Sequence, residues 1–231
     1  MVIMEILIKM DFTRQTNIFD PENQNLDITI IGAGSTGSFT ALNLAKMGFN
    51  KIKVIDFDTV EKHNIPNQFF RMQDIGKPKV DALQEIIKDF TGTEIQVENL
   101  EIKEDYEFDL GLNTLILLCV DSIDVRKLIF EKVKEFPIML MDTRFGGEGF
   151  SIHTVNLSET KENEKFAKSL NLKIKDTTCG AKSIIYTILS LASEVCNIIK
   201  KMEKEEAYPK LLKRELKTYN FIGKSTGGKN E

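Results

Sequence analysis

Residues 31–37 read IGAGSTG, so that Gly32, Gly34 and Gly37 form the pattern G-x-G-x-x-G. The apolar run Ile28–Ile31 comes directly before this stretch, and an amphipathic run follows it. In such a turn the first glycine permits a tight bend, the second lets the backbone approach a phosphate, and the third lets the helix pack on the strand. The first N–H groups of the helix also favour an anion. The stretch therefore predicts a strand–turn–helix unit that binds a nucleotide.

Apolar runs of strand length alternate with helical patterns on both sides of this turn. The expected strands are Ile28–Ile31, Ile52–Asp56, Glu94–Ile102, Thr114–Val120, Ile138–Met141 and Phe150–Val155. The expected helices follow Gly34, span Pro78 to Phe90, and follow the N-cap Ser122 as far as Val133. Strands that alternate with helices form parallel sheets with right-handed crossovers. The sequence therefore predicts an α/β fold: a Rossmann-like, doubly wound, mostly parallel sheet with helices on both faces.

The C-terminal third of the chain has a less regular pattern. Ser158–Ser169 is rich in charge and is expected to be exposed, whereas Lys182–Lys200 predicts an apolar helix buried on several sides. Lys201–Lys217 predicts a second, charge-dense helix, and Ile222–Glu231 is expected to be disordered. Because 231 residues suit one large α/β domain, we expect a single domain over residues 1–221 and a tail over 222–231.

The composition excludes several classes of protein. The net charge is −4, with 31 basic and 35 acidic residues well mixed along the chain, which argues against a nucleic-acid-binding face. No apolar run approaches the roughly 20 residues that cross a bilayer, so no membrane partner is expected. The three cysteines include no C-x-x-C pair, which argues against a paired-cysteine zinc site and is typical of reduced thiols in the cytoplasm.

An acidic residue, Asp56, ends the second predicted strand. In nucleotide-binding folds such a residue accepts hydrogen bonds from ribose hydroxyls. Together with the glycine turn, Asp56 favours a nucleotide site over a turn whose glycines serve packing alone. These features suit an NAD-dependent oxidoreductase as well as an ATP-dependent enzyme, so only further residues can separate the two.

The chain after Asp56 carries a longer motif. Residues 56–64 read DFDTVEKHN, Gln68 follows, and residues 74–79 read DIGKPK. Residues 13–15 read TRQ, and residues 119–122 read CVDS, with Arg126 beyond them. In this order, from residue 13 to residue 126, the segments resemble the ThiF/MoeB/HesA family of ubiquitin-activating-enzyme-like adenylyltransferases. The pattern of that family is D-x-D-x-V-[DE]-x-x-N-x-x-R-Q, followed by G-x-x-K.

The resemblance implies that ATP and Mg²⁺ are used to activate a carboxylate, with release of pyrophosphate. It implies that Lys79 contacts the ATP phosphates and that Asp121 holds the magnesium ion. Asp58, Asn64 and Gln68 are implied as further nucleotide contacts. The alternative readings are a solvated lysine at a helix start and an aspartate that only begins a helix. An NAD-dependent oxidoreductase is disfavoured because it has no use for either residue.

Arg14 resembles an arginine that, in dimeric members of the family, reaches the phosphates bound by the partner subunit. We therefore expect a homodimer, with the Lys182–Lys200 helix partly buried between the subunits. One departure from the family pattern is Asn67, which stands where the family has an arginine. Arg71 is a candidate substitute for that missing charge. The departure makes catalysis less secure than nucleotide binding.

Cys179 lies just before the long apolar helix, where a helix dipole would lower the pKa of its thiol. It falls in a region that resembles a cysteine-bearing part of several family members, which take up the activated partner there as a thioester or a persulfide. The alternative is an inert residue beside Gly180 at a helix cap. Cys119 and Cys196 sit in apolar runs and are expected in the core.

The most favoured function is adenylation of the C-terminal glycine of a ubiquitin-like or sulfur-carrier protein. A second hypothesis keeps the adenylation but takes a peptide or a modified-nucleoside carboxylate. A third is a nucleotide-binding scaffold with weakened catalysis, which the Asn67 departure suggests. The acceptor surface falls after residue 145, where the resemblance is loose, so the sequence leaves the partner open.

Overall fold

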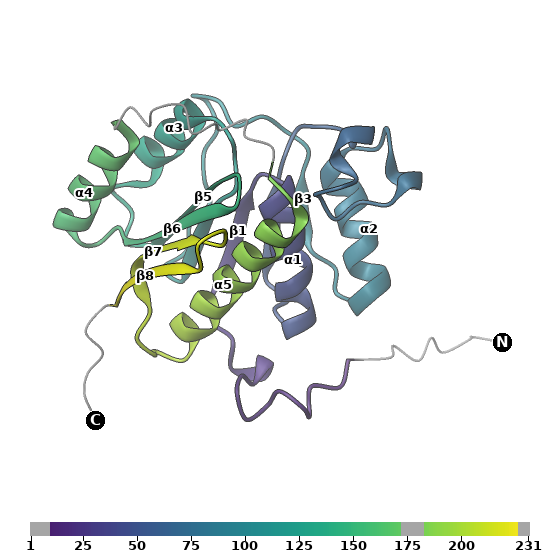
Figure 1. The fold of residues 1–231 in the computed structure, drawn as a ribbon, viewed down its shortest axis with the longest axis horizontal. Helices are drawn as coiled ribbons and strands as arrows, with labels where there is room; N and C mark the ends of the chain where they lie inside the picture. The colour runs from purple at the N-terminus through teal and green to yellow at the C-terminus, as the bar shows by residue number, and fades with distance from the viewer. Residues whose placement is uncertain (1–9, 172–182, 226–231) are drawn as a thin grey trace.

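Eight strands form one sheet in the computed structural model of the chain, which describes residues 10–171 and 183–225 (Figure 1). The strand order is β3-β2-β1-β4-β5-β6-β7-β8, parallel from β3 to β5 and antiparallel from β5 to β8. The strands are β1 Asp27–Ile31, β2 Ile52–Ile55, β3 Gln96–Glu98, β4 Thr114–Leu118, β5 Met139–Gly146, β6 Gly149–Asn156, β7 Pro209–Glu215 and β8 Asn220–Ser225. This arrangement confirms the predicted doubly wound, mostly parallel sheet.

Helices cover both faces of the sheet. They are α1 Ser35–Met47, α2 Lys79–Thr91, α3 Ile123–Val133, α4 Thr160–Asn171 and α5 Ile185–Glu203, with single 3₁₀ turns at Pro21–Asn23, Lys62–Asn64 and Met72–Asp74. Apolar residues of α1, α2 and α5 form one core layer, and those of α3 and α4 form a second. The central strand β4 contributes side chains to both layers. Leu115 and Leu117 belong to the first layer, and Ile116 and Leu118 belong to the second.

Local signals set the ends of two helices. α1 ends at Gly48, whose φ of 98° is left-handed and therefore suits glycine. The Ser122 hydroxyl accepts a hydrogen bond from the Val125 N–H, which confirms the predicted N-cap of α3.

One expectation about the C-terminal third is confirmed and one is wrong. Ser158–Ser169 is mostly exposed, as expected, and most of it forms α4, whose Phe166 packs edge-on against Phe130 at 5.2 Å between ring centroids. The apolar residues of α4 at positions 166 and 170 are buried, while its many charges face outward. Lys201–Lys217 is not a helix, because α5 ends at Glu203 and β7 pairs with β6.

The disordered tail predicted from Ile222 is also wrong for its first residues. β8 pairs with β7 through Ser225, so the sheet continues past residue 221, where the sequence predicts the domain to end. Residues 226–231 lie outside the described residues. The pairing between β7 and β8 is invisible in a local pattern that is rich in Lys and Gly.

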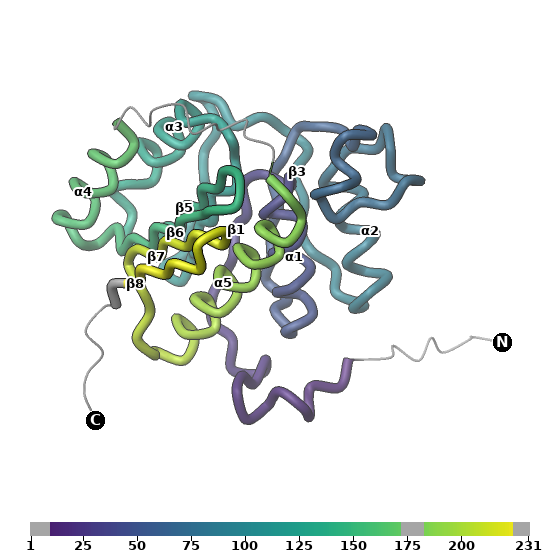
Figure 2. The backbone as a smooth tube through the Cα atoms, viewed as in Figure 1, coloured from purple at the N-terminus to yellow at the C-terminus, as the bar shows by residue number. Residues whose placement is uncertain are grey.

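The end of α5 is tied to the entry of β1. The Glu203 carboxylate accepts hydrogen bonds from the backbone N–H groups of Asn25, at 3.0 Å, and Leu26, at 2.8 Å. Figure 2 shows the C-terminal end of α5 beside the chain that leads into the central strands. Within the described ranges, no helix combines the length and the apolar character that a membrane span requires.

Candidate nucleotide-binding site

The glycine turn brings three backbone segments into contact. Gly32 has a φ of 100°, and a Cβ placed on it would lie 2.7 Å from the Cys119 carbonyl oxygen. A Cβ on Gly37 would lie 1.8 Å from the Gly32 carbonyl oxygen, whereas a Cβ on Gly34 would have no heavy atom within 4 Å. Two glycines are therefore required by packing, and the third borders open space, as the sequence pattern predicts.

The start of α1 is suited to an anion. Its N-cap residue, Gly34, has no side chain and makes no capping hydrogen bond. The first N–H groups of a helix carry a partial positive charge and favour a negatively charged ligand. The turn also lies where the chain crosses over in opposite directions from β1, toward β2 on one side and β4 on the other. Ligands of doubly wound sheets bind at this switch point.

Asp56 is anchored to the glycine turn. Its carboxylate accepts hydrogen bonds from the N–H groups of Ala33, at 2.6 Å, and Asp58, at 2.8 Å. Burial raises the pKa of Asp56 above its ordinary value, although the nearby Lys79 ammonium and the two N–H donors act in the opposite direction. The carboxylate is thus held in one orientation beside the turn, with lone pairs left for hydroxyl donors.

Lys79 begins α2 and meets an anion there. Its Nζ lies 2.7 Å from the Asp58 carboxylate, and its side chain is only 7% exposed, while that of Asp58 is 49% exposed. A cation at a helix N-terminus is unfavourable unless an anion compensates it, and Asp58 supplies that charge. The backbone adds a further tie, because the Lys79 N–H donates to the Asp58 carbonyl at 2.9 Å. The Lys79 ammonium is thus held in place near the Asp56 carboxylate.

Asn64 and Gln68 occupy the loop between β2 and α2. Asn64 is buried, and its Oδ1 accepts a hydrogen bond from the Glu61 N–H at 2.8 Å, so its side chain shapes the loop. The Oε1 of Gln68 is buried and has no hydrogen-bond partner. A buried acceptor without a donor is costly, so it marks a place where a ligand group would be stabilised. Ser38, which the sequence reasoning missed, ties this loop to α1 by accepting from the Phe69 N–H at 3.0 Å.

Asp121 is exposed and follows β4, whose end touches Gly32. In the described part of the chain, no three His, Cys, Asp or Glu side chains gather as a metal site. Mg²⁺ that accompanies a nucleotide takes few protein ligands and completes its shell with phosphate oxygens and water. A single carboxylate beside the glycine turn fits that use.

Two other predicted residues are not brought to the turn, and a third lies outside the described residues. Arg14 lies on an exposed turn beside the far end of α1, where the neighbouring Gln15 donates to the Met47 carbonyl at 2.7 Å. Since α1 has 13 residues, its two ends are roughly 20 Å apart. Arg71 does not take the place of the missing arginine, because its guanidinium pairs with the buried Asp74 at 2.8 Å. Cys179 lies outside the described residues.

The two described cysteines behave as core residues. Burial raises the pKa of the Cys119 thiol and that of the Cys196 thiol to about 12 each. Neither thiol is therefore ionised near neutral pH, and neither is suited to nucleophilic attack.

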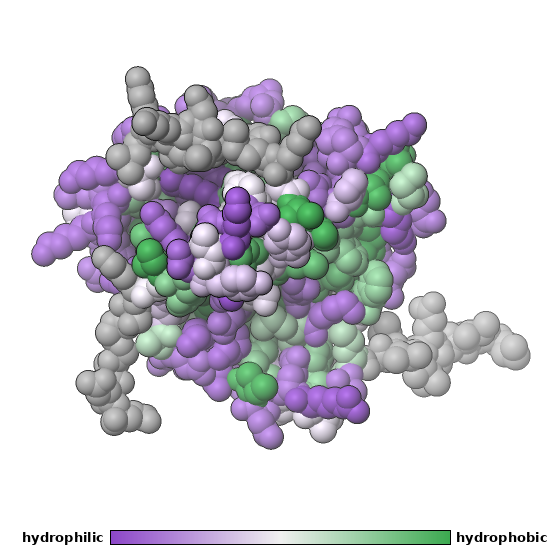
Figure 3. Space-filling model, in the orientation of Figure 1, coloured by the Kyte–Doolittle hydropathy of each residue, from purple (hydrophilic) through white to green (hydrophobic). Residues whose placement is uncertain are grey.

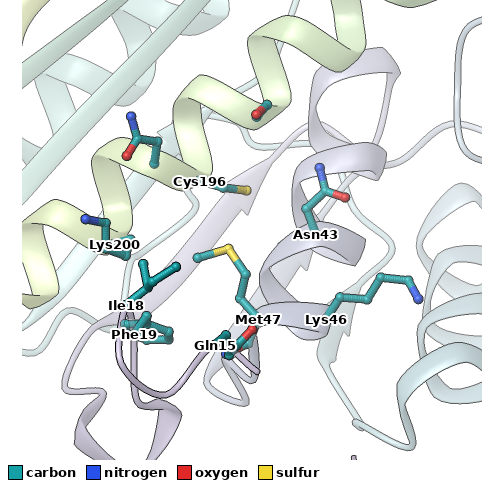
Figure 4. A pocket seen from close by; sticks show the side chains of 10 residues that line it. Gln15, Ile18, Phe19, Asn43, Lys46, Met47, Cys196 and Lys200 are labelled. Carbon is teal, nitrogen blue, oxygen red and sulfur yellow. The ribbon is translucent and has the colours of Figure 1, made fainter. Parts of the chain in front are cut away.

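A hollow of about 580 Å³ lies away from the glycine turn, between α1, α5 and the N-terminal turn (Figure 4). Met47, Cys196 and Phe19 line it together with the ammonium-bearing Lys46 and Lys200. Figure 3 shows apolar surface over α1 and α5 on this side of the molecule, with hydrophilic residues around it. The hollow is separate from the candidate nucleotide site.

The chain belongs to the ThiF family, whose model matches residues 12–225. It is 34% identical over 130 residues to the NEDD8-activating enzyme E1 catalytic subunit of Arabidopsis thaliana, covering 53% of this chain and 28% of that protein. It is 29% identical over 145 residues to ubiquitin-like modifier-activating enzyme 5 of Dictyostelium discoideum, covering 56% of this chain and 38% of that protein. The chain thus spans well under half the length of these relatives.

Solved structures share the fold. E. coli MccB with ATP matches with a TM-score of 0.69 and 14% identity, over 90% of this chain and 66% of that chain. PaaA matches with a TM-score of 0.68 and 20% identity, over 88% of this chain and 64% of that chain. The ThiF-like fold and the resemblance found in the sequence are therefore confirmed.

The glycine geometry predicts opposite results for two alanine variants. Gly37→Ala places a methyl group on the Gly32 carbonyl and should lower the free energy of unfolding by more than about 4 kcal/mol. Gly34→Ala has room for its methyl group and should melt within about 2 °C of the unaltered protein, yet lose nucleotide affinity because the methyl blocks the phosphate approach. Thermal melting and calorimetric titration with ATP measure both. A Gly34→Ala variant that binds ATP normally would contradict the assignment of this turn.

The environment of Asp56 predicts a pH dependence of ribose binding. Only the ionised carboxylate can accept both backbone N–H bonds and a hydroxyl bond, so affinity is present above its pKa and falls as the pH drops through it. Because burial raises that pKa, the loss should begin at a higher pH than for an exposed aspartate. Titration with adenosine, which lacks phosphates, should show this loss, and Asp56→Asn should bind weakly at every pH. An affinity for adenosine that stays constant through the acid range would contradict this role.

Proposed function

We propose that the chain is an ATP-dependent adenylyltransferase that activates a carboxylate and releases pyrophosphate. The observation that carries this proposal is the Lys79–Asp58 pair beside the glycine turn, since an NAD site has no need of a buried ammonium there. Membership of the ThiF family supports the same reading. The relatives named as activating enzymes of ubiquitin-like modifiers, and the MccB structure with ATP, agree with it.

In this mechanism the incoming carboxylate oxygen attacks the α-phosphorus of ATP. A P–O bond forms to the carboxylate, and the bond to pyrophosphate breaks with its electron pair. Two anions must meet, so positioning and positive charge supply most of the rate. The N–H groups at the start of α1 and the Lys79 ammonium would hold the phosphates, and Asp56 would orient the ribose. Bound Mg²⁺ would supply charge neutralisation at the phosphates, with Asp121 holding it.

The favoured substrate is the C-terminal glycine of a ubiquitin-like or sulfur-carrier protein. The names of the curated relatives support this class of partner. A peptide or a modified-nucleoside carboxylate is the second candidate, and the fold shared with MccB, solved with MccA, is compatible with it. A scaffold with weakened catalysis is the third, because Asn67 stands where the family pattern has arginine and Arg71 is already paired with Asp74.

The subunit arrangement and the thiol step are part of the same proposal. Arg14 is too far along α1 to serve the site of its own chain, so its proposed role requires a homodimer in which it acts on the partner. Three apolar residues at the start of α5 are exposed in the single chain: Ile184, Tyr186 and Leu189. They support a dimer in which the second subunit covers this face of α5. Cys179 is proposed as the thiol that accepts the activated partner.

Replacing Lys79 tests whether its ammonium is needed for adenylation. Lys79→Ala removes the buried ammonium and should lower ATP–pyrophosphate exchange by about 10²- to 10³-fold. The matched control is Lys77→Ala, whose partly exposed ammonium pairs with Glu85 at 2.5 Å and with Asp74 at 3.6 Å rather than with Asp58, so exchange should persist. Exchange is measured with candidate carrier proteins and peptides. Equal activity in both variants, or binding of NAD in preference to ATP by the unaltered chain, would overturn the proposal.

Mixing two inactive variants tests the shared site. Arg14→Ala and Asp121→Ala should each lack exchange activity alone. In a twofold dimer, half of the mixed population is heterodimer with one intact site in two, so about a quarter of the activity should return. The control is a mixture of Lys79→Ala with Asp121→Ala, which alter the same site, so neither site of their heterodimer is intact and no activity should return. Native mass spectrometry checks that heterodimers form, and no recovery in an Arg14→Ala mixture that contains them would show that Arg14 serves no partner.

A further inference from the structure

A fully buried carboxylate lies in the middle of β5, on the side of the sheet covered by α3 and α4. Asp142 has no exposed surface, and two arginines pair with it. The Arg126 guanidinium, itself buried, donates to Asp142 Oδ1, and the Arg144 Nε donates to Asp142 Oδ2 at 2.6 Å. A buried carboxylate is strongly unfavourable unless such partners compensate it. The sequence placed Arg126 in a family motif without a role and gave no sign of Asp142.

Arg126 makes a second contact that points toward the candidate site. Its Nη2 donates to the carbonyl of Val120, the residue directly before Asp121. The residue directly after Asp121 is Ser122, whose hydroxyl caps α3. The backbone on both sides of Asp121 is therefore held, while its own side chain remains exposed. One guanidinium thus connects a buried charge on β5 to the loop that carries the proposed magnesium ligand.

The geometry of arginine suits this connection better than that of lysine. A planar guanidinium presents several N–H donors in fixed directions, so one nitrogen can bond Asp142 while another bonds the Val120 carbonyl. An ammonium is a compact point charge and does not reproduce that fork. Stability alone does not require the ion pair, because apolar residues of similar volume often replace buried pairs without loss.

We infer that Asp142 and Arg126 are positioning residues for Asp121, acting through the Val120 carbonyl to aim its carboxylate at the metal that accompanies the nucleotide. This inference rests on the proposed function. Neither residue touches the phosphates: Asp142 orients Arg126, and Arg126 fixes the loop. Partners of metal ligands typically change metal affinity by about 10- to 100-fold when they are altered.

The test compares ATP binding with and without Mg²⁺ by calorimetry, together with the magnesium dependence of ATP–pyrophosphate exchange. Arg126→Lys keeps the positive charge but loses the fork, and Asp142→Asn keeps the shape but loses the charge. Both should bind metal-free ATP within about twofold of the unaltered protein and lose about 10- to 100-fold of the affinity gained with Mg²⁺. High magnesium should restore exchange in both variants.

The matched control is Arg71→Lys, which weakens a guanidinium pair with another fully buried carboxylate, Asp74. It should lower the melting temperature but retain the full gain from Mg²⁺. If Arg126→Lys and Asp142→Asn retain that gain, or lose metal-free and magnesium-dependent binding equally, the pair has no positioning role. Loss of folded protein in both variants would make the pair structural and overturn the inference. Failure of the unaltered chain to bind ATP would instead overturn the proposed function, and the inference with it.

Discussion

The close backbone contact at the glycine turn is the constraint on which the other parts of the site depend. Gly37 rests on the Gly32 carbonyl, and Gly32 in turn rests on the carbonyl of Cys119. These contacts bring the start of α1 against the end of β1 and bring β4 alongside. Since Asp56 is bonded to Ala33 within the same turn, the ends of three strands are fixed relative to one another. A side chain at either tight position would separate them.

Charge is placed at this edge of the sheet in pairs that are already hydrogen-bonded. Asp56 is held by two N–H groups, Lys79 by Asp58, and Asp142 by two arginines. Groups held in this way need little rearrangement when a charged ligand arrives, and such preorganisation is the main source of electrostatic stabilisation in enzymes. Burial of the Asp56 carboxylate disfavours its ionised form, as its raised pKa shows.

Sequence patterns predicted the parts of the molecule that local chemistry determines. The glycine turn, the Ser122 cap and the run of β4 follow from neighbouring residues, and the order of the motifs led to the family. The pairing of β7 with β6 depends on contacts made far along the chain, so the charge-rich segment Lys201–Lys217 was misread as a helix. The same limit applies to the site. Asp142 directly follows an apolar run, and no neighbouring residue indicates that two arginines pair with it. The position of Arg14 depends on how the N-terminal turn packs against the end of α1.

The bond from Glu203 to the entry of β1 joins residues that are 178 positions apart in the chain. β1 is a central strand, yet the helix that secures its entry leaves the ribosome long after it. Contacts between such distant residues slow folding, because a long loop must close before they form. During synthesis, the apolar face of α1 that packs against α5 would therefore stay uncovered until α5 emerges. A chain interrupted before α5 would present that face to chaperones and to other nascent chains.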